Sequence, residues 1–490
     1  MTPEDTVKLR VMNIALACCL TLFFLACVAS PPVDLDVWHE MALIRESLAA
    51  GHLLTQDRFA YTPTIAPMVD HEWGAGAILY ALASLGGNWP IVALKYLLAL
   101  ATAALALICA RLRGASYQTL CVLTPFAMPL FGLGCGTLRA HAYSFLFIAL
   151  LLCFLELDSA GKRFWIVPWL LLLAVWANIH GGCVVGIAVL SLYWVEQVAR
   201  RRPHLHLLAT IALSFAAMGL NAYGLAYYRQ LWHALRMPRP EIAEWSPVWR
   251  GAPGYVALFS ITLAVAGYAV AKLGPRASRG ALILAALAAG AIVHIRMVPI
   301  YAVVWAAYVP AYVSATPLGQ RIAGLFRRRE AVTVVCLVGT IFFGVMLAGI
   351  GAWRLTVPGD FFPVGAVRYL ADQRFRGNVM TPYDQGAYVT WRLFPGVKVS
   401  LDSRYETAFA PALADESFRF YKAEPGWRET LMKYPTDLVL TLRTAPLARA
   451  MPSTGWKRVY ADRWFELYAR PGLELPFRDG SREGSWGSFP

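Results

Sequence analysis

Residues 31–75 contain the side chains best suited to chemistry. Carboxylates and imidazoles can accept or donate a proton, and both can ligate divalent cations. Because the flanking sequence is almost entirely apolar, so many ionisable groups indicate a functional site. The alternative is a solvent-exposed loop whose charged side chains only interact with water. The residues concerned are Asp34, Asp36, His39, Glu40, Asp57, Asp70, His71 and Glu72. Among them, adjacent Asp70, His71 and Glu72 have the ligand types of a divalent metal ion, the one cofactor this stretch suggests.

Further polar side chains stand at the ends of apolar runs later in the chain. They are Arg139, His141, His180, Glu244, His294 and Arg296. Guanidinium groups hold phosphate oxygens through paired donors, so Arg139 and Arg296 are candidates for binding a lipid-linked phosphate. His180 and Glu244 are substrate or metal candidates. Each also has a structural interpretation, in which the arginines reach lipid headgroups, a histidine hydrogen-bonds a carbonyl, and Glu244 with Trp245 anchors the chain at the membrane interface.

The composition predicts a membrane protein that crosses the bilayer many times. Of 490 residues, 58% are hydrophobic and 15% are charged, against about 25% charged in soluble proteins. The net charge of +14 lies in short loops between apolar runs, which favours membrane topology over a nucleic-acid partner. The nine cysteines lie in or beside apolar runs without metal-ligand spacing, so neither a zinc site nor a disulfide framework is expected.

Eleven apolar runs approach the ~20 residues that a spanning helix needs. The first is expected to be an uncleaved span, because Pro31 and Pro32 follow it without a small-residue cleavage site. The expected spans are 11–30, 90–112, 117–135, 140–157, 164–179, 183–199, 205–221, 253–272, 280–295, 297–314 and 331–352.

Charge fixes the expected orientation. With the N-terminus in the cytoplasm, every inside loop is basic, as the positive-inside rule requires. The outer loop 31–89 and all residues after 353 then face the periplasm. In this outer loop, residues 36–50 and 73–87 are predicted to be helices lying along the membrane surface.

After residue 353 the composition of the chain changes, because polar and charged residues become more frequent. Residues 1–353 form the predicted transmembrane domain, 354–475 an extracytoplasmic α/β domain, and 476–490 a disordered Gly/Ser-rich tail. In the outer domain, polar residues could line a ligand site or simply cap strands and helices. They are Asp384, Gly386, Asp402 and Arg404.

The first outer loop resembles that of the GT-C membrane glycosyltransferases, which include protein O-mannosyltransferases and lipid A aminoarabinose transferases. The resemblance rests on DVWHEMALIRESLAAG, HLLTQDRFAY and DHEWGAGAILYALASLGG. It extends through WANIHGG, NAYG, EWSP and YDQGAYVTWRLFPGVKVSLDSRYE to uncharacterised bacterial relatives. By this resemblance Asp36 takes the place of the catalytic acidic residue. The family's Asp-Glu pair becomes Asp36-Val37 here, so Asp34 is a competing candidate.

The resemblance implies a GT-C-like fold in the bacterial inner membrane and an inverting transfer of sugar from a polyprenyl-phosphate donor. The acceptor would be a glycan, lipid or protein on the outer face, with Asp36 as base and Arg139 or Arg296 against the leaving phosphate. Membrane lipids would surround the spans. Two alternatives remain: a non-enzymatic glycan-assembly or binding protein, and a transporter or flippase for lipid-linked sugars. The absence of repeats and of mid-span charges disfavours the second alternative.

Overall fold

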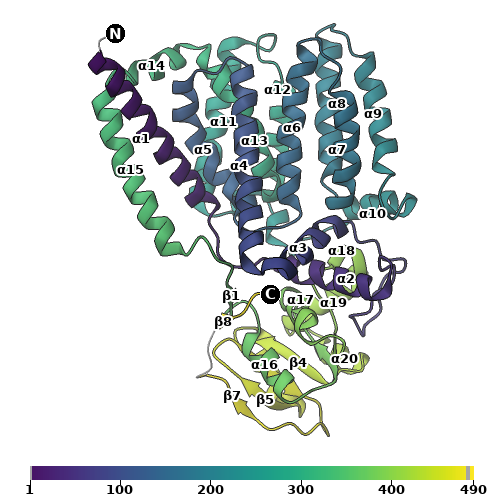
Figure 1. Cartoon of the computed structure of the whole chain (residues 1–490). Helices are drawn as coiled ribbons and strands as arrows, with labels where there is room; N and C mark the ends of the chain where they lie inside the picture. Colours follow the sequence, from purple (N-terminus) through teal and green to yellow (C-terminus); the bar gives the residue numbers. More distant parts are fainter. Residues whose placement is uncertain (1–2, 482–485) are drawn as a thin grey trace. The chain divides into compact units, whose positions relative to one another are not determined.

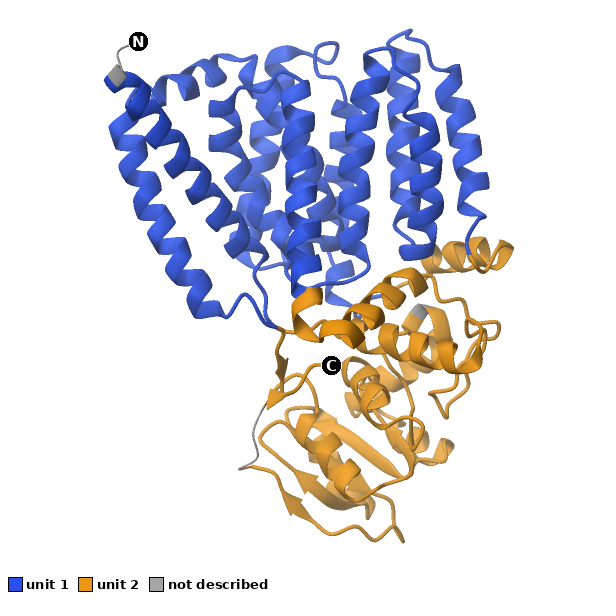
Figure 2. Ribbon diagram, in the orientation of Figure 1, with its two compact units in different colours: residues 1–31, 92–221, 239–354 blue, residues 32–91, 222–238, 355–490 orange. Residues whose placement is uncertain are grey.

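The structure is a computed structural model that describes residues 3–481 and 486–490 (Figure 1). The chain forms two compact units, each assembled from segments far apart in the sequence (Figure 2). Unit 1 comprises residues 1–31, 92–221 and 239–354. Unit 2 comprises residues 32–91, 222–238 and 355–490.

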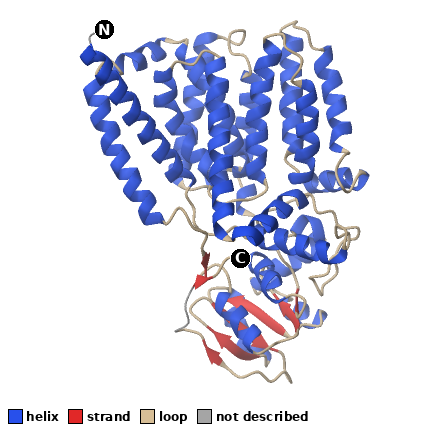
Figure 3. Cartoon of the chain, viewed as in Figure 1, coloured by secondary structure: helices blue, strands red, loops and turns tan. Residues whose placement is uncertain are grey.

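Unit 1 is a bundle of apolar helices (Figure 3). Among the described residues, seven helices are long and apolar enough to cross a membrane: α1 (Pro3–Val28), α4 (Asn88–Leu112), α5 (Tyr117–Cys135), α6 (His141–Ser159), α11 (Pro253–Leu273), α13 (Val298–Ser314) and α15 (Arg329–Ile350). Four predicted spans form shorter apolar helices: α7 (Ile166–Ile179), α8 (Cys183–Ala199), α9 (Leu205–Met218) and α12 (Ala281–Val293). Short connecting helices are α14 (Pro317–Leu325), η1 (Ala243–Trp245), η2 (Val248–Arg250) and η3 (Ile295–Met297). All eleven predicted spans are therefore helical, seven of them at full spanning length, in a multi-pass membrane protein.

Burial separates the centre of this bundle from its periphery. In the segment containing α13, 83% of the apolar window is buried, and the helix packs against α5, α6, α11 and α12. For α15 the buried share is 11%, and its main partner is α1. An apolar helix surface left open in this way faces hydrocarbon rather than water.

Unit 2 contains a six-stranded mixed sheet in the order β3-β2-β4-β6-β5-β7. The strands are β2 (Gly377–Met380), β3 (Val397–Val399), β4 (Leu438–Leu442), β5 (Lys457–Ala461), β6 (Phe465–Ala469) and β7 (Arg478–Asp479). Parallel β2 and β3 are joined through a helix, because a tight turn cannot connect parallel strands. The helices after residue 355 are α16 (Val364–Asp372), α17 (Tyr383–Leu393), α18 (Tyr405–Ala408), α19 (Pro411–Tyr421), α20 (Trp427–Lys433), α21 (Pro446–Ala450) and η4 (Met451–Thr454). The predicted α/β region is confirmed.

The first outer loop belongs to this same unit. It supplies α2 (Asp36–Ala50) and α3 (Trp73–Gly86), and the unit also includes α10 (Leu225–Arg236). The N–H of Val399 donates to Phe59 O at 3.0 Å, and the N–H of Tyr61 donates to Val399 O at 3.1 Å. These bonds cover the edge strand β3, whose backbone groups would otherwise lack partners. The loop is therefore built into the C-terminal unit, whereas the sequence had placed the boundary at residue 354.

The C-terminal tail differs from the predicted disorder wherever it is described. Residues 478–479 form β7 beside β5, and β8 (Trp486–Gly487) pairs antiparallel with β1 (Val357–Pro358). Residues 482–485 of the predicted tail lie outside the described residues. Strand pairing supplies backbone hydrogen bonds that the Gly/Ser-rich composition of the tail did not indicate.

Candidate functional site

Helix α2 positions the two acidic residues favoured as catalytic. It begins at Asp36, and Asp34 Oδ1 accepts a hydrogen bond from the N–H of Asp36 at 3.1 Å. The helix ends at Gly51, which has a left-handed backbone with φ of 75° and donates to Leu48 O. Asp34 therefore contacts the helix start, while Asp36 is the first residue of the helix itself.

His39 lies on the same side of α2 as Asp36. Its Nδ1 is 3.8 Å from Asp36 Oδ1 and 2.7 Å from Ser403 Oγ. Asp36 and His39 are each 8% exposed. Burial lowers the pKa of His39 below its usual 6.5, although Asp36 and Asp402 oppose the shift. The neutral imidazole is therefore favoured, with one nitrogen directed at the serine hydroxyl.

Glu40 is a buried carboxylate in the first turns of α2. It is 2% exposed, and neither carboxylate oxygen has a hydrogen-bond partner among the described residues. Burial raises its pKa well above the usual 4.5, and the nearby charges of Glu72 and Asp36 raise it further. The backbone of Gly76 in α3 passes so close that a Cβ there would lie 2.9 Å from Glu40 O. Burial and the neighbouring carboxylates therefore favour the neutral form of Glu40.

The second acidic segment, Asp70 to Glu72, lies directly before α3. Asp70 Oδ1 accepts from the N–H of Glu72 at 3.1 Å, and His71 Nε2 is 3.5 Å from Glu72 Oε1. Burial raises the pKa of Asp70, while the Glu72 N–H and His71 oppose the shift. Among the described residues, no group of three or more His, Cys, Asp or Glu side chains is placed to hold a metal ion. The metal hypothesis for Asp70, His71 and Glu72 therefore has no support from the described residues.

The C-terminal part of unit 2 contributes residues that the sequence did not assign to the site. Ser403 contacts His39, and burial together with Asp36 raises the pKa of Asp384. Ser403 was not anticipated, because its only signal is its position between Asp402 and Arg404. We call the set Asp34, Asp36, His39, Glu40, Asp70, Glu72, Asp384 and Ser403 the acidic cluster.

Arg404 and Asp402 serve packing rather than a ligand rim. The Arg404 guanidinium makes a two-point contact with Asp402, Nη2 to Oδ2 at 2.7 Å and Nε to Oδ1 at 2.9 Å. Arg404 Nη1 also pairs with Asp57, and all three side chains are buried. A Cβ on Gly386 would lie 2.1 Å from Leu401 O, so this glycine permits close packing. Asp402, Arg404 and Gly386 therefore have packing roles, whereas Asp384 belongs to the acidic cluster.

In unit 1, two arginines meet one carboxylate. Arg296 Nη1 lies 2.7 Å from Glu244 Oε1, and Arg139 Nη1 lies 3.3 Å from Glu244 Oε2. The Arg296 guanidinium also stands over the Trp245 ring at 5.5 Å. His294 Nδ1 lies 2.7 Å from Trp245 O, which connects η1 to the start of η3. We call Arg139, Glu244 and Arg296 the arginine cluster; its two cations converge on a place already occupied by an anionic group.

His180 has a structural place at the end of α7. Its Nδ1 accepts from the N–H of Gly182 at 3.0 Å and lies 2.7 Å from Ser144 Oγ. Trp176 Nε1 donates to the same hydroxyl at 2.7 Å. These bonds order the turn between α7 and α8, which gives His180 a structural role.

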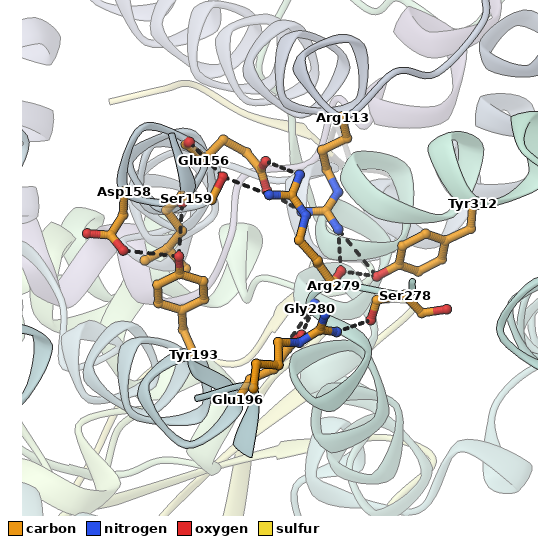
Figure 4. A network of polar contacts seen from close by, with 12 residues as sticks. Arg113, Glu156, Asp158, Ser159, Tyr193, Glu196, Ser278, Arg279, Gly280 and Tyr312 are labelled. Carbon is orange, nitrogen blue, oxygen red and sulfur yellow. Dashed lines mark hydrogen bonds and ion pairs between the residues drawn. The ribbon is translucent and has the colours of Figure 1, made fainter. Parts of the chain in front are cut away.

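A third polar network in unit 1 joins helices through residues of the basic loops (Figure 4). Glu156 pairs with Arg113 and, at 3.2 Å, with Arg279. The N–H of Gly280 donates to both carboxylate oxygens of Glu196 at 2.8 Å. Each buried charge thus has a partner, and the network connects α4, α6, α8 and the start of α12 as a structural element.

The comparison with solved structures is informative about fold. An oligosaccharyltransferase from Archaeoglobus fulgidus, in its apo form, superposes with a TM-score of 0.59 at 12% identity, over 96% of this chain and 75% of that one. The same enzyme tethered with an acceptor peptide containing the NVT sequon gives 0.57 at 12% identity, with the same coverage. The arabinofuranosyltransferase AftD from Mycobacteria, as its R1389S mutant, gives 0.53 at 16% identity, over 94% of this chain and 41% of that one.

No family model matches the sequence, and no curated protein matches it. The structural likeness extends over almost the whole chain. The chain therefore has the fold of the GT-C membrane glycosyltransferases, as the first outer loop predicted.

Proposed function

We propose that this protein is a membrane glycosyltransferase that moves a sugar from a polyprenyl-phosphate donor to an acceptor hydroxyl, with inversion at the anomeric carbon. The observation that carries the proposal is the position of Asp36 at the start of α2 in a chain of GT-C fold. Two of the similar solved structures are of enzymes that transfer glycans.

Asp36 acts as the base in this mechanism. Its carboxylate removes the proton from the acceptor hydroxyl while that oxygen bonds to the anomeric carbon. The bond from this carbon to the phosphate oxygen breaks in the same displacement, so no covalent sugar–enzyme intermediate forms. His39 remains neutral and holds Ser403, and neutral Glu40 adds no further negative charge beside Asp36.

The arginine cluster binds the phosphate of the donor. Two guanidinium groups that already hold a carboxylate can hold phosphate oxygens with the same donor geometry. As the glycosidic bond breaks, negative charge develops on the leaving polyprenyl phosphate, and the arginines stabilise that charge. In this mechanism the Glu244 carboxylate occupies the binding position of the donor phosphate as long as no donor is bound.

The acceptor is a glycan, a lipid or a protein presented outside the cytoplasm of a bacterium. The basic loops support a cytoplasmic N-terminus and a periplasmic C-terminus in the inner membrane. Reporter fusions at Arg202 and Arg328 are expected to read as cytoplasmic, and fusions at Gly87 and Arg354 as periplasmic. A cytoplasmic signal at Gly87 would contradict this orientation.

A non-enzymatic binding protein is the second candidate. Val37 follows Asp36 where the related enzymes have Glu, and Asp36 itself is only 8% exposed. Such a protein would bind lipid-linked glycan without turnover.

Incubation of the purified full chain with labelled polyprenyl-phosphate sugars and extracted envelope acceptors separates the two candidates. The enzyme releases polyprenyl phosphate and labels an acceptor. Donor binding with no release under any acceptor condition would favour the binding protein.

A further inference from the structure

A long groove lies in unit 1, away from the residues assigned to transfer. Its volume is about 1340 Å³, which exceeds the ~300–1,000 Å³ of an ordinary small-molecule pocket. The groove lies along α1 and is bounded by α4, α5 and the turn between α14 and α15. Its lining includes Lys8, Leu9, Met12, Leu16, Leu20, Leu107, Tyr117, Cys121, Arg327 and Arg328.

One wall of the groove is an apolar stripe on α1. Leu9, Met12, Leu16 and Leu20 recur every three or four residues and therefore lie on one side of the helix. At 1.5 Å per residue the stripe is roughly 16 Å long. This length matches one leaflet of a bilayer, since the whole hydrocarbon core is about 30 Å thick.

One end of the groove is basic. Arg329 Nη1 lies 3.3 Å from Asp5 Oδ1, and Lys8 Nζ lies 2.9 Å from Glu4 Oε1 and 3.1 Å from Glu330 Oε1. These two cations are therefore matched by neighbouring carboxylates. Arg327 and Arg328 are exposed, and no acidic side chain in the described part of the chain pairs with them. The groove thus combines an apolar wall one leaflet long with two unmatched guanidinium groups at its end.

We propose that this groove binds an anionic glycerophospholipid, with the headgroup phosphate at Arg327 and Arg328 and an acyl chain along the stripe on α1. A free phosphate or a nucleotide would leave the apolar wall uncovered. A zwitterionic lipid has a phosphate but no net charge to balance the two arginines, and a neutral lipid has no phosphate for them to bind. The proposal does not depend on the proposed transferase activity, because none of its residues belongs to the acidic or arginine cluster.

The test uses the full chain in detergent, supplied with equal amounts of phosphatidylglycerol and phosphatidylcholine and analysed by native mass spectrometry. Wild type is expected to retain phosphatidylglycerol at least tenfold more than phosphatidylcholine. R327A/R328A should lose this preference. The matched control R202A/R276A removes the same charge from exposed positions outside the groove and should keep it.

A second variant separates lipid binding from general surface charge. Ala17 lines the groove, so Ala17→Trp fills its apolar part and leaves every arginine in place. It should reduce phosphatidylglycerol retention as strongly as R327A/R328A does. Equal retention of both lipids by wild type, or unchanged retention in both groove variants, would overturn the proposal. Preferential retention of undecaprenyl phosphate over phosphatidylglycerol would overturn the choice of occupant.

Discussion

The acidic cluster and the arginine cluster hold charge in opposite ways. In the acidic cluster, burial favours neutral forms, as in Glu40 and His39. In the arginine cluster, all three side chains keep partial exposure and pair as ions, with 21–31% of each side chain accessible. Groups whose protonation state is set by burial suit proton transfer, whereas a pre-formed pair of guanidiniums suits anion binding. The difference supports the proposal that proton transfer and phosphate binding belong to separate sets of residues.

The largest expected effect follows from removing the base. Asp36→Asn keeps the shape of the side chain but cannot accept a proton, so the transfer rate should fall by a factor of about 10² to 10⁴. Turnover of labelled donor measures this loss.

Asp34→Asn is the matched control, because Asp34 lies two residues earlier and contacts the start of α2 through its carboxylate. Loss of turnover in the Asp34 variant with normal turnover in the Asp36 variant would move the role of base to Asp34. Normal turnover in both would remove the acidic cluster from catalysis.

The next largest effect concerns the phosphate. Arg296→Ala removes charge-assisted hydrogen bonds of about 1.5–3 kcal/mol, so donor affinity should fall by roughly 10- to 100-fold. Arg296→Lys should recover only part of this, because an ammonium lacks the two-pronged donor geometry. Equilibrium binding of labelled donor is the measurement. Arg202→Ala, an exposed arginine in a loop, is the control, and an equal loss in both variants would contradict the role of Arg296.

A smaller effect of opposite sign is expected at Glu244. If its carboxylate holds the phosphate position, Glu244→Gln should tighten donor binding about fivefold. That factor corresponds to about 1 kcal/mol for two partly exposed ion pairs. A weaker affinity would show instead that Glu244 positions the arginines.

The smallest effect concerns stability and pH. Because the folded-state pKa of Glu40 is raised, its contribution to stability is fully present below the unfolded pKa of about 4.5 and is lost as pH rises toward the folded pKa. Glu40→Gln removes that dependence. Its Tm relative to wild type should therefore increase as the pH is raised above about 4.5.

Glu429→Gln, at an exposed glutamate, provides the control and should show a Tm difference that does not change with pH. A pH-independent difference for Glu40→Gln as well would contradict the assignment of a neutral Glu40.

The sequence predicted features that depend on residues close together in the chain, and it missed features that depend on residues far apart. Helix α2 was placed at 36–50 because Asp36 and Gly51 mark its ends within one short segment. The association of the first outer loop with the C-terminal part of unit 2 was not foreseen, because the residues that meet, such as His39 and Ser403, are 364 positions apart in the sequence. Local periodicity carries no information about such pairs. Glu40 was noticed as a displaced acid, but its burial depends on the approach of Gly76 from α3, which no pattern in the sequence encodes.

The contacts within the arginine cluster also could not be predicted from the sequence. Topology placed Arg139, Glu244 and Arg296 at the outer ends of different spans, which suggested a shared role. Topology could not show that both arginines contact a single carboxylate, because that depends on how η1 and η3 pack. Residue types therefore identified the candidates, and only the fold identified their partners.

The division of work between the two clusters is tested most directly by measuring donor binding and transfer on the same preparations of the Asp36→Asn and Arg296→Ala variants. The expected result is that the Asp36 variant binds donor as wild type does and transfers almost nothing. The Arg296 variant should bind donor weakly, and a higher donor concentration should restore only part of its transfer rate, because the same guanidinium stabilises the leaving phosphate. Loss of donor binding in the Asp36 variant, together with unchanged binding in the Arg296 variant, would contradict the account.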